Sequence, residues 1–249
     1  MLEKVDFILK RLDSRHLSIL WSFYRDYFAD DSECIAFLYD ALKKEPEQSS
    51  IVYDDNLQCN IDDNVFIPRR MINTVERLVT AARDMDIIRR GEDIFKIIYI
   101  VTCVETLQNL KGYITEKYKQ LFGFFKDHTS DTDRNFIASN FVYCGNPSDD
   151  LYGEADIIEC DTFMCFIGAL NEYRNCAVHN GEYWDICFNN GNSSSPLLVI
   201  LNIDVNNYKQ TRKQSQSAIF HTTISYSDFE KIFVRTCIRF IQDYIDTQG

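Results

Sequence analysis

Apolar residues recur along this chain mostly at intervals of three and four positions, the spacing that buries one face of an α-helix. Residues 4 to 44 contain two such stretches, and the polar residues 30 to 32 are expected to separate them. The next stripe follows Pro68, a residue that suits the first turn of a helix. The remaining helices are expected at residues 68–90, 94–110, 114–126, 161–179 and 227–244.

Two later segments alternate apolar and polar residues instead, and both are rich in Val, Ile and Thr. These segments, residues 197–205 and 217–225, are predicted to pair as a small hairpin. Residues 135–143 are short and apolar, and they suit either a helix or a strand. The pattern predicts a mainly α fold: a helical bundle with additional N-terminal helices and a β-hairpin insertion at about residues 196–225, before the last helix.

A polar segment interrupts the apolar pattern after the first helices. It spans residues 45–64, contains Pro46 and carries several Asp residues, so it is typical of a linker. We therefore expect an N-terminal helical segment with an acidic linker over residues 1–64. A helical domain that includes the hairpin is expected over residues 65–249.

The chain has no segment that suits a membrane or a secretion signal. Its start is broken by charges, and its longest apolar run contains Lys96, Glu105 and Gln108. The nine cysteines are odd in number and irregular in spacing, and several lie in apolar runs. We therefore expect reduced, mostly buried thiols and a cytoplasmic protein without a membrane partner.

A zinc site is the alternative reading of some of these cysteines. Cys160, Cys165, Cys176 and His179 lie within twenty residues of one another, but the chain contains no CxxC pair. The usual phosphate-binding loop, G-x-x-x-x-G-K-[ST], is also missing from the sequence. The expected protein therefore needs neither a metal nor a cofactor.

The net charge of -12 disfavours a protein that holds nucleic acid along an extended basic surface. Residues 141–185 contain nine acids and a single base, Arg174. The most basic local stretch connects the two predicted strands and contains Lys209, Arg212 and Lys213. Those three side chains are therefore the first candidates for contacts with a polyanion.

The sharpest chemical feature is the cluster Arg174-Asn175-(x3)-His179 near the end of a predicted helix. Asp161 or the next residue is the expected N-cap of that helix, and Asn180-Gly181 is a good stop signal. RNA brings its own nucleophile, the 2′-hydroxyl, so cleavage requires proton transfer and stabilisation of an anionic phosphorane. An imidazole suits the first task and a planar guanidinium the second, and neither task requires a metal.

The segment from residue 173 to 184, YRNCAVHNGEYW, resembles the RNxxxH region of HEPN domains, as found in Abi-like abortive-infection proteins and in type VI CRISPR effectors. The resemblance implies a four-helix HEPN fold that forms a homodimer with a composite active site. It further implies a metal-independent endoribonuclease that cleaves single-stranded RNA, acting as a toxin or an antiviral defence effector. An antitoxin or another regulatory protein is then a possible partner.

The spacing within the motif supports a shared site. Five residues along an α-helix place two side chains about 140° apart around the axis, so Arg174 and His179 of one chain would not grip one phosphate together. A twofold axis could bring two copies of each around one cleft. In this arrangement Asn175 would orient the imidazole or a ribose hydroxyl, and Tyr183 and Trp184 could stack on unpaired bases.

Two other readings remain open. The chain could be a non-catalytic HEPN dimer that binds RNA, a nucleotide or a regulatory protein, which its acidic surroundings favour. Alternatively, the motif is a coincidence in a helical interaction protein. Arg174 would then pair with an acid such as Glu172 or Asp185, and His179 would cap its own helix end.

Overall fold

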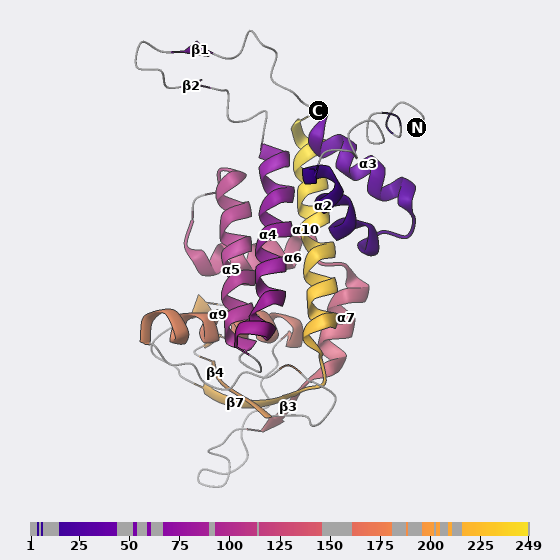
Figure 1. Cartoon of the computed structure of the whole chain (residues 1–249). Coiled ribbons are helices and arrows are strands. Elements are labelled where there is room, and N and C mark those ends of the chain that lie inside the picture. The colour runs from indigo at the N-terminus through magenta and orange to yellow at the C-terminus, as the bar shows by residue number, and fades with distance from the viewer. Residues whose placement is uncertain are drawn as a thin grey trace.

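The computed structural model describes residues 4, 6, 15–43, 52–53, 59–60, 67–89, 93–113, 115–145, 161–180, 188, 196–201, 203–204, 209–210 and 216–248. For residues 52–53, 59–60, 143–145, 180, 196–201, 203–204, 209–210, 216–220 and 248, it describes the backbone alone. Figure 1 shows α4, α5 and α10 side by side, with α2 and α3 beside the C-terminal half of α10. The strands β3, β7 and β4 lie at the opposite end.

The N-terminal helices form where the apolar pattern predicts them. Helix α2 (Arg15–Tyr24) passes into a 3-10 turn, η1 (Arg25–Tyr27), and α3 covers Asp31–Leu42. Asp30 separates them because its side chain accepts a hydrogen bond from the Glu33 backbone N–H and so caps α3. The two helical stretches are separated as predicted, but the break lies at residues 28–30, and residues 31 and 32 belong to α3.

The central bundle consists of α4 (Ile67–Ile88), α5 (Asp93–Leu110), α6 (Lys117–His128) and α10 (Tyr226–Gln248). Pro68 lies in the first turn of α4, as its fixed φ favours. Aromatic rings from α6 and α10 meet in the centre, where Phe124 packs on both Phe233 and Phe240. Burial of these rings and of the aliphatic stripes of α4 and α5 supplies the main favourable free energy of folding.

Helix α7 (Asp131–Asn140) leads directly into β3 (Phe141–Gly145), so the ambiguous stretch at residues 135–143 contains both a helix and a strand. The insertion before α10 pairs β4 (Pro196–Leu201) with β7 (Gln216–Thr222) in antiparallel register. Strand β3 joins the other edge of β7, so the sheet order is β3-β7-β4. The predicted hairpin is confirmed, and the third strand, β3, begins within the stretch for which the sequence left helix and strand open.

Two short antiparallel pairs lie outside this sheet. One pairs β1 (Val52–Tyr53) with β2 (Cys59–Asn60) within the segment expected to be a linker. The other pairs β5 (Ile203–Asp204) with β6 (Lys209–Gln210) within the insertion. The fold is therefore mainly α with small β elements, as predicted.

The hydrophobic core crosses the boundary that the sequence suggested near residue 65. Leu20 of α2 and Leu38 of α3 belong to the same buried cluster as Val79 of α4 and Phe240 of α10. In addition, the Tyr24 hydroxyl donates a hydrogen bond to the Ile72 backbone oxygen at 2.8 Å. The N-terminal helices therefore share their core with the helices that follow.

One expectation about the cysteines is wrong. Cys34, Cys103, Cys176 and Cys237 are not disulfide-bonded, but Cys165 is, and the partner side chain lies outside the described residues. The error arises because irregular spacing in the sequence does not reveal which cysteines the fold brings together. As regards membranes, the described helices include none that is both long and apolar enough to span one.

Candidate active site

Helix α9 (Thr162–Asn175) carries Arg174 and Asn175 of the motif and packs against several other elements. The Asp161 side chain caps its N-terminus by accepting hydrogen bonds from the Phe163 and Met164 backbone N–H groups. The helix packs on α5, α6 and α7 and on strands β3 and β4. Its residues from Phe163 to Leu170 are all buried, so the position of its C-terminal end is fixed by a close-packed core.

Arg174 lies in the last turn of this helix and is only 8% exposed. Its Nη2 donates to Glu105 Oε1 at 2.8 Å, and its Nη1 donates to the Asn175 side-chain oxygen at 3.1 Å. A charge-assisted bond and a side-chain amide therefore hold both ends of the guanidinium fork. The partner carboxylate is not that of Glu172, because it comes from α5, 69 positions away. The other local acid, Asp185, lies outside the described residues.

Glu105 connects Arg174 to a second cation. Its other oxygen, Oε2, lies 3.3 Å from the Nζ of Lys117 at the start of α6. The Lys117 side chain is 64% exposed, so water screens this pair and it adds little stability. The Glu105 carboxylate is largely shielded, at 16% exposure, and so it depends on Arg174 for compensation of its charge.

His179 lies in a different local environment, because α9 continues as a π-helical turn, η4 (Cys176–Asn180). Within that turn Ala177 is buried, whereas Val178 and His179 are exposed. A π turn closes its hydrogen bond over five residues, so each residue rotates less around the axis than in an α-helix. The expected 140° separation of Arg174 and His179 was derived for an α-helix and does not hold across this turn.

The other predicted site residues are placed only in part. The Asn175 side chain bonds to Arg174, and within the described residues His179 makes no hydrogen bond. Lys209 lies on β6 with its backbone alone described. Tyr183, Trp184, Arg212 and Lys213 lie outside the described residues.

Two ionisable groups next to Arg174 are shielded from water. Burial raises the pKa of Glu172 above its usual range. Burial also raises the pKa of Tyr173, and the neighbouring Cys176 thiol adds to that effect. In both cases burial shifts the equilibrium towards the uncharged form of the side chain.

Glu172→Gln is expected to stabilise the protein at neutral pH and to have a smaller effect in acid. Because the folded-state pKa of Glu172 is raised, ionisation of this residue destabilises the fold as pH increases above the unfolded-state pKa, about 4.3. Glutamine cannot ionise, so the variant avoids this loss. Urea unfolding of both proteins at several pH values would measure the difference, and a difference that does not change with pH would contradict the prediction.

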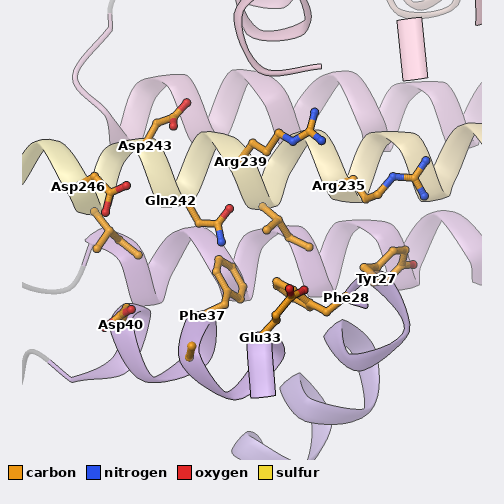
Figure 2. Close-up of a pocket in the computed structure, with 13 residues that line it drawn as sticks. Tyr27, Phe28, Glu33, Phe37, Asp40, Arg235, Arg239, Gln242, Asp243 and Asp246 are labelled. Atoms are coloured by element: carbon orange, nitrogen blue, oxygen red, sulfur yellow. The ribbon is translucent and has the colours of Figure 1, made fainter. Parts of the chain in front are cut away.

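A cavity of about 630 Å³ lies elsewhere, between α3 and α10. Figure 2 shows its lining from the two helices: Glu33 and Asp40 on α3, and Arg235, Arg239, Gln242, Asp243 and Asp246 on α10. Acids outnumber bases in this lining, which disfavours RNA there. The cavity includes no residue of the motif, so we base the candidate site on the motif and its partners.

The zinc alternative loses support. Cys165 is disulfide-bonded and cannot supply a thiolate ligand. Among the residues that the structure describes, no group of three or more His, Cys, Asp or Glu side chains is placed to hold a metal ion. Cys160 lies outside those residues.

Sequence reasoning missed Glu105 and Lys117 as parts of this site. A signal for Glu105 was present, because it is an acid inside the apolar run of residues 94–110, and a shielded charge requires a partner. The identity of that partner depends on the packing of α9 on α5. A single sequence does not give this long-range contact.

Comparison with known proteins found no matching family model, no matching curated protein and no matching solved structure. The likeness to HEPN domains therefore rests on the dozen residues from 173 to 184 alone.

Proposed function

We propose that this protein is a HEPN-type, metal-independent endoribonuclease that cleaves single-stranded RNA at a composite site shared by two copies of the chain. The observation that carries the proposal is the arrangement at the C-terminal end of α9. There a guanidinium is anchored by Glu105 and Asn175, and an imidazole is exposed five residues later in a π turn. Single π turns occur frequently at functional sites.

Each side chain has a distinct role in the proposed reaction. The 2′-oxygen of a ribose attacks the adjacent phosphorus, and the bond to the 5′-oxygen of the next nucleotide breaks. Arg174 stabilises the negative charge of the phosphorane. The imidazole of His179 removes the proton of the 2′-hydroxyl, and a proton is returned from imidazolium to the departing 5′-oxygen. The products are a 2′,3′-cyclic phosphate and a 5′-hydroxyl, and the step consumes neither water nor an oxidant.

The different exposure of the two residues supports a dimeric site. Arg174 is buried against α5, whereas His179 is exposed to solvent, so the two side chains do not face one another within one closed pocket. We therefore pair Arg174 of one protomer with the partner's His179 around a twofold axis. Asn175 then acts as a positioning residue for Arg174.

The biological role is inferred from the likeness to HEPN proteins. A toxin or antiviral defence effector in the cytoplasm would need a controlling partner, such as an antitoxin, because free RNA cleavage harms its host. Tyr183, Trp184, Lys209, Arg212 and Lys213 remain proposed substrate contacts.

The wild-type protein is expected to cut a labelled single-stranded RNA in the presence of EDTA. Because the proposed chemistry uses only Arg and His, chelation of divalent ions leaves the rate unchanged. The fragments should carry cyclic phosphates, which a kinase and phosphatase assay of the ends would detect. Cleavage that stops on addition of EDTA, or fragments with 5′-phosphates, would overturn the proposal.

A non-catalytic dimer is the second candidate, and the Arg174–Glu105 pair favours it. A guanidinium that is already neutralised by a carboxylate binds a phosphate less readily. This candidate predicts a stable dimer that binds its ligand and leaves RNA intact.

A further inference from the structure

The corner between α5 and α6 combines lysines and tyrosines in an otherwise acidic chain. Residues 111–119 read KGYITEKYK, with three lysines, two tyrosines and one glutamate, whereas the whole chain has a net charge of -12. We name residues 111–113 and 115–119 the basic corner. Tyr113 is 50% exposed, and the side chains of Lys117 and Lys119 are 64% and 46% exposed.

Hydrogen bonds fix the backbone of the basic corner. Helix α5 ends at Leu110 and is followed by Gly112, whose φ of 80° favours glycine. The Tyr113 N–H donates to the Gln108 backbone oxygen at 3.0 Å. The buried Gln120 side chain of α6 then donates to the Tyr113 backbone oxygen at 2.9 Å. Gln108 in turn donates to the Gln120 backbone oxygen, so hydrogen bonds connect the end of α5 to the start of α6. The exposed Tyr113 is therefore presented from a fixed position.

The basic corner is continuous with the candidate active site. Lys117 lies 3.3 Å from Glu105, and the same carboxylate binds Arg174 at 2.8 Å. A strand whose phosphate occupies Arg174 would therefore meet Lys117 as the next cation. This region contains four bases and two acids: Lys111, Lys117, Lys119 and Arg174 against Glu105 and Glu116.

We infer that the basic corner binds the single-stranded RNA substrate beside the cleavage site, an inference that rests on the proposed function. Lys117 and Lys119 contact phosphates, and the Tyr113 ring stacks on an unpaired base. Sequence-independent binding of single strands generally combines a cationic track with aromatic faces. An acidic polypeptide would satisfy the lysines but would give the exposed tyrosine no base to stack on.

The inference can be tested by measuring RNA binding with an RNA that the protein is unable to cleave. A fluorescent 2′-O-methyl RNA oligonucleotide has no free 2′-hydroxyl, so it stays intact, and its anisotropy reports binding to the full-length protein. Neutralising two phosphate contacts in Lys117→Gln/Lys119→Gln should reduce the slope of log affinity against log salt by about 1.4. Tyr113→Ala should weaken binding between about 5-fold and about 100-fold.

The matched control is Lys126→Gln/Lys231→Gln, which removes the same charge from exposed positions on α6 and α10. It should change the salt slope by much less than the corner variant. Equal slopes for the two double variants, no binding by wild type, or displacement of the RNA by polyglutamate as readily as by unlabelled RNA would each overturn the inference. Circular dichroism would check that all variants fold.

This measurement separates the inference from the proposed function. Binding that depends on the basic corner without any cleavage of ordinary RNA would contradict the endoribonuclease and leave the binding surface supported. Cleavage of ordinary RNA with binding that is unaffected by the corner variants would reject the basic corner alone.

Discussion

His179→Ala is expected to lower the rate of RNA cleavage by about 10²-fold to 10⁴-fold, the range that positioned acid–base groups contribute. The free energy of unfolding should stay within about 0.5 kcal/mol of the wild-type value, since His179 is exposed and makes no hydrogen bond within the described residues. Single-turnover cleavage of a labelled single-stranded RNA and urea unfolding would measure the two quantities. A loss of activity could then be assigned to chemistry and not to misfolding.

His16→Ala provides a matched control for this experiment. His16 is also exposed, and it lies on α2, where its Nε2 is 2.7 Å from the Asn73 side-chain oxygen. The control should cleave RNA at the wild-type rate after the same purification, which also tests for a contaminating nuclease. Unchanged cleavage by His179→Ala would remove His179 from the mechanism.

Much of the fold follows from local sequence pattern. The apolar stripe that follows Pro68 is buried in α4, where it includes Ile72, Val75 and Val79, and the aromatic side chains of α10 lie in the core. These elements are predictable because helical periodicity and burial are expressed within a few turns of chain. The β3 strand was ambiguous because it directly follows α7, and its strand character depends on pairing with β7 about 80 positions later.

Only the residues of the candidate site that lie close together in the sequence were predictable. The spacing of Arg174, Asn175 and His179 marks these residues in the sequence, whereas Glu105 and Gln108 argue there only against a membrane span. Their partners come from distant segments: Gln108 bonds to α6, and Glu105 bonds to Arg174 of α9. The sequence also did not predict the π turn, because residues 176–180 suit an ordinary helix end.

The dimeric arrangement can be tested by combining two inactive variants in one molecule. Arg174→Lys retains a positive charge near Glu105 but loses the planar fork, so it should fold and fail to cleave. Arg174→Ala is less suitable, since removing one partner of a shielded ion pair costs on the order of 3 kcal/mol. His179→Ala is the second inactive variant.

Co-expression of Arg174→Lys and His179→Ala with two different affinity tags would yield pure heterodimers after sequential purification. Each heterodimer retains one intact pairing of Arg174 with the partner's His179, so cleavage should recover to roughly half of the wild-type rate by symmetry. Heterodimers of wild type with Arg174→Lys provide the reference for one intact composite pair. If the doubly tagged variant dimer forms but remains as inactive as its parents, the two residues do not act across the dimer axis. The π turn would then leave Arg174 and His179 of one chain as the only pair that could work together.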